Sequence, residues 1–212
     1  MKQPKTARTA PLGDTVTAAA NMPEIREGQS VALLQELHIL TRDGKLNQDS
    51  RRKLKQVYHL YQFIEPLLKE VQAEEGKLRP GVSLVDHGAG KSYLGFIIYD
   101  LFFKALHGTP GDSSHIYGIE TREELVSRSQ ELAKQFNFPG MSFLPLSVAE
   151  STESKLLPDQ IDIVTALHAC NTATDDAIQF ALKKKAKYMV LVPCCQAEVA
   201  SVLKKNLSLI HI

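Results

Sequence analysis

The segment at residues 83–95 constrains the fold of this chain more than any other part of it. It reads S-L-V-D-H-G-A-G-K-S-Y-L-G, an apolar run followed by an acidic residue and two closely spaced glycines. A nearly unbroken aliphatic run before a turn is typical of a buried parallel strand. Glycines allow backbone conformations and a close ligand approach that side chains would block. Apolar residues then recur at helical spacing up to Leu106, so the segment predicts a strand, a turn and a helix whose N-terminus meets a ligand.

The chain beyond residue 80 alternates between predicted strands and predicted helices. Such alternation predicts an α/β fold, a Rossmann-like doubly wound parallel sheet with helices on both faces. A capping box formed by Thr121 and Glu124 is expected to start the second helix, and a polar loop is expected at residues 150–159. The strands are expected at residues 82–85, 116–119, 141–146, 161–167 and 188–192, and the helices at 92–106, 121–136, 174–185 and 197–205.

The first 79 residues do not follow this alternation. Residues 1–30 lack periodicity and predict a flexible arm, whereas residues 31–79 predict a helical extension with a short first helix and a longer second one, kinked at Pro66. Residues 80–212 form the predicted Rossmann-like domain. The longer helix begins with the cations Arg51, Arg52, Lys53 and Lys55, for which a solvated helix face and a contact to a phosphate backbone are both open.

Composition narrows the class of protein. With 212 residues, 43% of them hydrophobic, the chain has enough apolar side chains for one domain with an appendage. A net charge of +1 argues against a strongly basic nucleic-acid binder. No apolar run of about 18 residues occurs, and two of the three cysteines are adjacent. These features predict a cytoplasmic protein without a membrane segment, and no metal site is expected.

Three classes of ligand compete for the glycine turn. A P-loop is excluded, because its first glycine would fall at Val85, inside the strand. A dinucleotide fingerprint is weakened, because Tyr93 stands where its third glycine belongs. S-adenosylmethionine carries no phosphate and needs an acidic residue before the glycines, which Asp86 provides. Glu120, at the end of the next strand, is expected to bind ribose hydroxyls rather than only to cap the following helix, although S-adenosylmethionine and NAD share that ribose.

Ligands of doubly wound sheets bind beyond the carboxyl ends of the strands. The predicted cofactor contacts are therefore strand-end residues: Asp86, His87, Gly88, Ala89, Gly90, Glu120, Ser147 and Leu167. His168 is the candidate catalytic residue, as a general base, with a substrate ligand and a packed imidazole as the alternatives. The substrate side is expected at Asn171, Cys194, Cys195 and Gln196.

Three motifs carry a resemblance to a known family. They are V-D-H-G-A-G-K-S-Y-L-G at residues 85–95, A-L-H-A-C-N-T-A-T-D at 166–175 and V-P-C-C-Q at 192–196. In this order they resemble class I S-adenosylmethionine-dependent methyltransferases. The branch in question contains the methyltransferase-like 25 proteins, the glutathione S-transferase C-terminal domain proteins and the tRNA 2'-O-methyltransferases of the Trm13 type. The resemblance implies cofactor contacts at Asp86, Gly88, Gly90 and Glu120, and it favours an RNA acceptor, tRNA or rRNA.

The same resemblance raises an expectation about the C-terminus. This fold normally continues after its fifth strand with a helix and two more strands, whereas the sequence stops at Ile212, so a truncated copy without the last two strands is expected. Two further interpretations stay open beside a methyltransferase. One is a catalytically silent RNA- or ribosome-associated binding module, and the other is a nicotinamide oxidoreductase, against which the imperfect dinucleotide fingerprint speaks.

Overall fold

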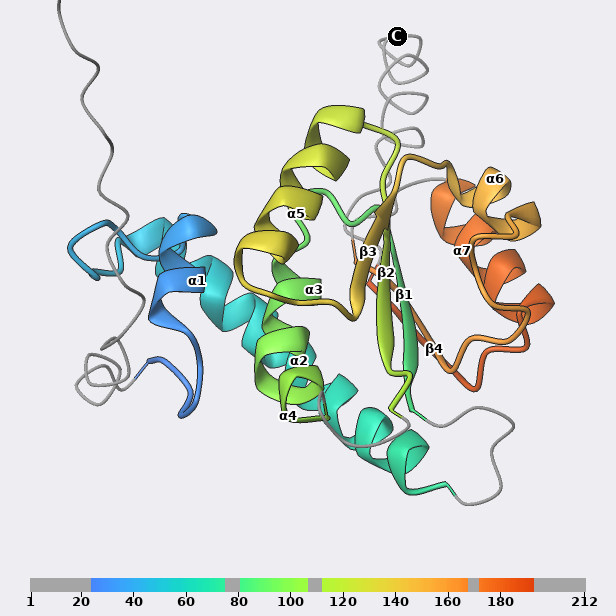
Figure 1. Cartoon of the computed structure of the whole chain (residues 1–212), viewed down its shortest axis with the longest axis horizontal. Helices are drawn as coiled ribbons and strands as arrows, with labels where there is room; N and C mark the ends of the chain where they lie inside the picture. Colours follow the sequence, from blue (N-terminus) through green and yellow to red (C-terminus); the bar gives the residue numbers. More distant parts are fainter. Residues whose placement is uncertain (1–23, 75–80, 107–111, 168–171, 193–212) are drawn as a thin grey trace, which may run out of the picture.

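A computed structural model describes residues 24–74, 81–106, 112–167 and 172–192, and in them a five-stranded parallel sheet forms the centre (Figure 1). The strand order is β3-β2-β1-β4-β5, and every neighbouring pair is parallel. The strands are β1 (Ser83–His87), β2 (His115–Ile119), β3 (Met141–Leu144), β4 (Ile163–Ala166) and β5 (Tyr188–Leu191). All five lie where the sequence predicts them, although their bounds differ from the predicted ones by one to three residues.

The strand order places the functional edge of the sheet. From β1 the chain runs outward through β2 to β3, and then it returns to the other side of β1 for β4 and β5. The order therefore reverses between β1 and β4, whose carboxyl ends are where ligands bind in sheets of this kind. β1 is buried along its whole length, as a central strand covered on both faces should be.

Helices cover both faces of the sheet, as expected for a doubly wound fold (Figure 1). One face carries α3 (Tyr93–Ile98) and α5 (Glu123–Gln135), and the other carries α6 (Val148–Glu153) and α7 (Thr172–Lys183). A π-helical turn, Tyr99–Phe103, joins α3 to α4 (Lys104–Leu106) in one continuous helical run. The Asp100 carboxylate in this turn accepts hydrogen bonds from the Ser30 amide (2.6 Å) and from Lys104 Nζ (3.2 Å), so the run is tied to the N-terminal extension.

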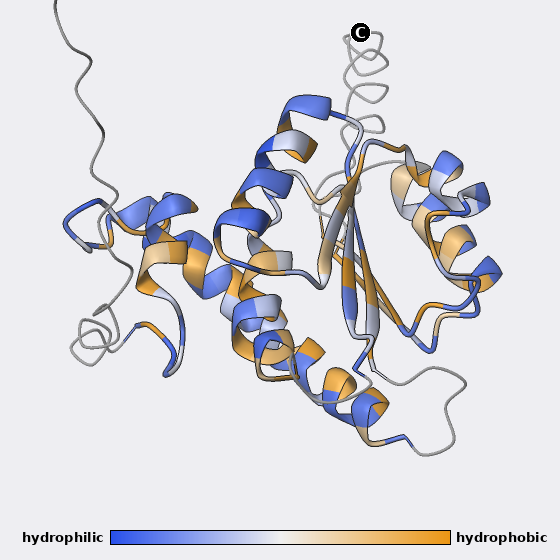
Figure 2. Cartoon of the chain, in the orientation of Figure 1, coloured by the Kyte–Doolittle hydropathy of each residue, from blue (hydrophilic) through white to orange (hydrophobic). Residues whose placement is uncertain are grey.

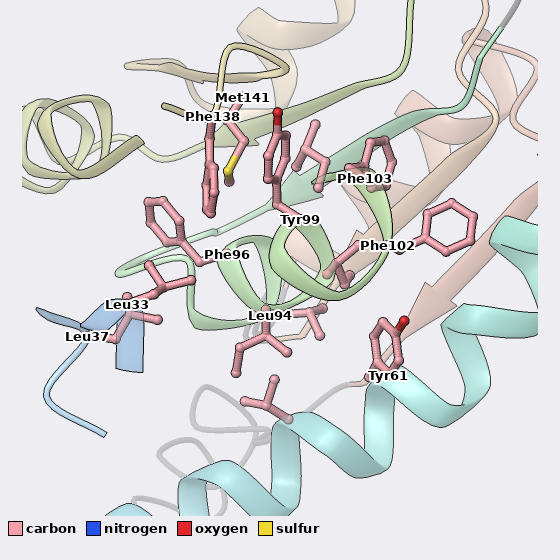
Figure 3. Packing of buried hydrophobic residues seen from close by; sticks show 14 of the residues in the cluster. Leu33, Leu37, Tyr61, Leu94, Phe96, Tyr99, Phe102, Phe103, Phe138 and Met141 are labelled. Atoms are coloured by element: carbon pink, nitrogen blue, oxygen red, sulfur yellow. The ribbon is translucent and has the colours of Figure 1, made fainter. Parts of the chain in front are cut away.

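The helical extension shares the hydrophobic core of the sheet. It consists of α1 (Val31–Glu36) and α2 (Gln48–Ala73), and apolar residues alternate with polar ones along α2 (Figure 2). Leu33 and Leu37 lie with Leu94 and Phe96 of α3 in one buried cluster (Figure 3). The extension and the sheet domain are therefore one packed body along this face.

Two features of the extension differ from the sequence prediction. Residues 24–30, predicted as part of a flexible arm, pack against α2: Ile25 is buried, and the Arg26 guanidinium lies 4.7 Å from the centre of the Tyr61 ring. Helix α2 also runs on through Pro66. Pro66 and Gln62, whose carbonyl loses its helical partner, both lie on the exposed side, where water satisfies that carbonyl.

Two predictions about caps and loops are wrong. α5 begins at Glu123 with Arg122 in the cap position and no capping side chain, so Thr121 and Glu124 form no capping box. A capping box occurs instead at Ser147 and Glu150, where it starts α6 in a segment predicted to be a polar loop. The helix is only six residues long, too short for a periodic apolar pattern to reveal it. In the parts of the chain that the structure describes, no helix is both long and apolar enough to cross a membrane.

Candidate active site

A cavity of about 270 Å³ lies between helix α2 and the turn that follows β1. The turn contributes Gly88 and Ala89, and Asp86 reaches the cavity from the end of β1. Leu167 follows directly after β4, so the cavity lies where the strand order reverses. Its remaining lining residues are Lys53, Gln56, Val57 and Leu60 of α2 and Tyr93 and Leu94 of α3.

The carboxylate of Asp86 is almost completely shielded from solvent. The residue is 3% exposed, and its Oδ1 accepts a hydrogen bond of 2.6 Å from the Thr165 hydroxyl of β4. Burial raises the pKa of Asp86 to about 6, and the Thr165 hydrogen bond opposes that rise without cancelling it. The charged form therefore lacks a cationic partner among the described residues, which makes Asp86 suited to bind a cation in the cavity.

The turn is shaped by two glycines in the left-handed region. Gly88 has φ +65° and Gly90 has φ +58°, conformations that side chains disfavour. No atom lies within 4 Å of the place where a Cβ on Gly88 would stand, so the backbone there is open to a ligand. The Ala89 amide donates to the carbonyl of Ile119 (3.0 Å), which fastens the turn to the end of β2.

Glu120, at the end of β2, is held by several donors. Its Oε2 accepts hydrogen bonds from the Gly90 amide (2.9 Å) and from Arg122 Nη2 (3.1 Å), and its Oε1 accepts from the amide and Nε of Arg122 (3.1 and 3.0 Å). Burial by itself raises the pKa of Glu120, but the hydrogen bonds and charge of Arg122 and the Gly90 amide outweigh it and lower the pKa to about 2. Glu120 thus clamps the glycine turn to β2.

Two further predicted contacts, His87 and Ser147, do not line the cavity, and neither do Gly90 and Glu120. His87 follows Asp86 in β1, so its side chain points to the opposite face of the sheet, where it is fully buried with its ring centre 4.5 Å from that of Phe180 of α7. Burial lowers the pKa of His87 to about 4, which keeps the ring neutral. The Ser147 hydroxyl is engaged in the cap of α6.

Five predicted residues lie outside the described residues. They are the candidate general base His168 and the substrate-side residues Asn171, Cys194, Cys195 and Gln196. Their roles therefore stay predictions. Among the cofactor predictions, the structure brings Asp86, Gly88, Ala89 and Leu167 together in the cavity and links Glu120 to them through Gly90.

Helix α2 was predicted from the sequence, but its position as one wall of the cavity was not. Lys53, Gln56, Val57 and Leu60 fall at positions i, i+3, i+4 and i+7, which is one face of a helix. The pattern is visible in the sequence, but it is equally typical of a face that packs on the core. Only the direction in which α2 crosses the end of β1 shows that this face borders a cavity.

The chemistry of the cavity fits S-adenosylmethionine. Asp86 offers an anion for the ammonium of its amino-acid end, and the open backbone at Gly88 allows close approach. Apolar side chains of Val57, Leu60, Leu94 and Leu167 suit the uncharged part of the ligand. Lys53 is the one cation among the lining residues, and the Asp86 carboxylate in the same cavity would repel a diphosphate.

A Rossmann-like α/β domain with an acidic residue and a glycine turn at the switch point is the class of protein that the fold and the cavity define. The chain belongs to the family described as a methyltransferase domain, which matches residues 52–202. The match begins within α2 and includes most of that helix, whereas α1 lies before it. S-adenosylmethionine, the cofactor predicted from the sequence, is the cofactor that this family and fold support.

Several curated proteins are similar over most of this chain. The glutathione S-transferase C-terminal domain-containing protein of Homo sapiens is 25% identical over 166 residues, which cover 78% of this chain and 22% of that protein. The protein of the same name from Xenopus laevis is 24% identical over 165 residues, covering 77% and 23%. The chain thus spans less than a quarter of the length of these relatives. One of the three groups in the predicted branch is therefore found among the relatives.

Two solved structures are among those similar to this chain. A precorrin-6y C5,15-methyltransferase from Geobacter metallireducens is 14% identical, with a TM-score of 0.43 and 66% of each chain covered. The TrmK protein of M. capricolum, in complex with S-adenosyl-homocysteine, is 12% identical, with a TM-score of 0.38, 58% of this chain and 49% of that chain covered.

Proposed function

We propose that this chain is an S-adenosylmethionine-dependent methyltransferase domain that acts on RNA. The observation that carries the cofactor half of the proposal is the cavity at the switch point. There a buried Asp86 carboxylate, without a cationic partner among the described residues, and an open glycine backbone meet an apolar wall. Family membership supports methyl transfer as the reaction class.

The residues of the chain have separate tasks in this function. Asp86 holds the cationic amino group, Gly88 and Ala89 let the cofactor approach the backbone, and Glu120 binds the ribose. The cofactor supplies an electrophilic methyl group on a positively charged sulfur. The apolar residues of α2 and α3 exclude water, and the chain aligns an acceptor lone pair with that methyl group. His168 stays the predicted proton acceptor.

The proposal of an RNA acceptor rests on narrower grounds. The exposed cations Lys91 and Arg128 line one surface pocket next to the glycine turn, where they would contact phosphates. Arg122 is exposed as well, but its guanidinium is paired with Glu120. The basic start of α2 contributes less than its sequence indicates, because Arg51 pairs with Glu24 (3.1 Å) and Arg52 with Asp49 (3.9 Å). The predicted relation to tRNA methyltransferases adds further support.

Transfer of a labelled methyl group tests both halves of the proposal. The chain is incubated with labelled S-adenosylmethionine and with the RNA, protein and small-molecule fractions of a cell extract. We expect label in RNA and none with an Asp86→Asn variant. Label in protein or small molecules alone would overturn the RNA acceptor and leave the reaction class intact, whereas no binding of S-adenosylmethionine by calorimetry would overturn the function itself.

A catalytically silent binding module is the second candidate. The observation that favours it is the engagement of Glu120, whose two oxygens accept four hydrogen bonds from Gly90 and Arg122. A ribose would have to displace one of these donors. Such a module would bind RNA in a salt-dependent manner without transferring a methyl group to any of the three fractions.

A further inference from the structure

The cavity is lined by one cation and one anion. Among its ten lining residues Lys53 is the only positively charged side chain, and Asp86 is the only negatively charged one. They come from different elements, α2 and β1. The cavity therefore presents opposite charges from two of its walls to whatever enters it.

Lys53 is held at the cavity without a carboxylate partner. Its Nζ lies 6.0 Å from the centre of the Tyr93 ring, within reach of a cation–π interaction. No ion pair of Lys53 occurs among the residues that the structure describes, whereas the preceding Arg51 and Arg52 are both paired. Gln56, one helical turn further on, lines the same wall and adds an amide donor. This wall is suited to an anion that enters beside the Tyr93 ring.

We propose that Lys53, with Gln56, binds the carboxylate of the amino-acid end of S-adenosylmethionine while Asp86 binds its ammonium. The inference rests on the proposed function and extends it to the N-terminal helix. A zwitterion matches opposite charges on two walls of one cavity, and a polyanionic acceptor does not, because Asp86 would repel it. The extension thus selects a cofactor that carries a complete amino acid.

Two ligands distinguish a role of Lys53 in binding the carboxylate from a role in supporting the structure of the cavity. S-adenosylhomocysteine has the amino-acid end, and 5'-methylthioadenosine lacks it but keeps the adenosine. We expect Lys53→Gln to weaken S-adenosylhomocysteine binding about tenfold, as for the loss of one charge-assisted hydrogen bond, and to leave 5'-methylthioadenosine binding unchanged. Lys53→Arg should keep most of the affinity for S-adenosylhomocysteine.

The matched control is Lys55→Gln. Lys55 is an exposed lysine on the same helix and does not line the cavity, so this variant removes the same charge and should bind both ligands as the wild type does. Calorimetry on the full chain gives the affinities. Thermal unfolding without ligand shows whether each variant is folded.

Each other result overturns the proposal in a recognisable way. An equal loss of affinity for both ligands would make Lys53 a structural support of the cavity. Unchanged binding of both ligands, together with weaker binding of RNA, would assign the cation to the acceptor. If the wild type binds 5'-methylthioadenosine as tightly as S-adenosylhomocysteine, the amino-acid subsite is absent while the proposed cofactor class stands. If the wild type binds neither, the proposed function fails as well.

Discussion

The ends of β1 and β2 each carry a carboxylate, and the protein shifts the pKa values of the two in opposite directions. Asp86 is buried with a single hydroxyl donor, and its pKa is raised to about 6. Glu120 is also buried, but four donors from Gly90 and Arg122 surround it, and its pKa is lowered to about 2. The protein thus stabilises the charge of Glu120 internally, whereas the charge of Asp86 has no cationic partner among the described residues.

The two carboxylates therefore contribute to stability with opposite signs. Asp86 holds its proton more tightly in the folded chain than in the unfolded one, so its ionisation destabilises the fold as the pH rises from about 4 to about 6. Glu120 releases its proton more easily in the folded chain, so its contribution is present above a pH of about 4.5 and is lost as the pH falls toward 2.

The largest expected effect comes from Asp86→Asn. At pH 7.5 the affinity for S-adenosylhomocysteine should fall about 100-fold, because the ammonium loses its only anionic partner. Without ligand the same variant should be more stable than the wild type by up to about 3 kcal/mol, since two pKa units of unfavourable ionisation are removed. Calorimetry and urea unfolding between pH 4 and pH 8 give both quantities. If the variant is less stable than the wild type at pH 7.5 and still binds S-adenosylhomocysteine, the folded protein does stabilise the ionised Asp86, and the prediction is wrong.

Gly88→Ala should have the next largest effect on binding. The added Cβ would project into the open space beside Asp86, and the affinity for S-adenosylhomocysteine should fall by about tenfold or more. Gly28→Ala is a matched control, because Gly28 also has positive φ (+81°) with nothing within 4 Å of its Cβ position and lies away from the cavity. Both variants should lose about 1 kcal/mol of stability, and a comparable loss of binding in both would exclude a role for the open backbone.

Glu120→Gln should reduce stability and binding together. It removes the charge that holds Arg122 and the Gly90 amide, so we expect a loss of about 1–2 kcal/mol at pH 7.5 and roughly tenfold weaker adenosine binding. Stability measured from pH 2 to pH 5 should rise less steeply with pH than in the wild type. Unchanged stability combined with weaker binding would mean that Glu120 contributes to ligand binding and not to the stability of the fold. The two carboxylates would then differ in their position in the cavity region, and not in how the protein stabilises their charge.

The smallest effect is expected for Thr165→Val, which removes the one hydrogen-bond donor to Asp86 found among the described residues and keeps the shape of the side chain. The pKa of Asp86 should rise further, because the hydroxyl now lowers it. S-adenosylhomocysteine needs the ionised carboxylate, so the pH at which its affinity is half lost should move upward by up to about one unit. Calorimetry across pH 5–8 measures this midpoint, and an unmoved midpoint would show that Thr165 does not tune Asp86.

The sheet and the glycine turn could be predicted from the sequence because they depend on local patterns. β1, Asp86, Gly88 and Gly90 are consecutive in one motif, and Glu120 follows directly from the end of β2. The alternation of side chains along a strand also predicts that Asp86 and His87 point to opposite faces of the sheet. Both residues were nevertheless predicted to contact the cofactor, although their side chains cannot face the same ligand.

Lys53 and the α2 wall could not be found in the same way. Lys53 and Asp86 belong to different elements, and their approach depends on how α2 crosses the sheet. The apolar face of α2 is compatible with many crossing angles. Ser147 was expected at the end of a strand, but β3 ends at Leu144 and Ser147 caps α6. This role depends on Glu150 and on a helix too short to be recognised from the sequence.

The shared core of α2 and the sheet has a consequence for where the chain can be divided. Val57 borders the cavity, Leu54 and Tyr61 lie in the same buried cluster as Leu84 and Ile97, and Lys187 near β5 is bonded to Glu74 at the far end of α2. A protein shortened to begin at residue 80 would expose this cluster to water and would lose the wall of the cavity that α2 forms. The smallest autonomous folding unit thus includes α2, and the helix is as much a part of the protein's interior as the strands are.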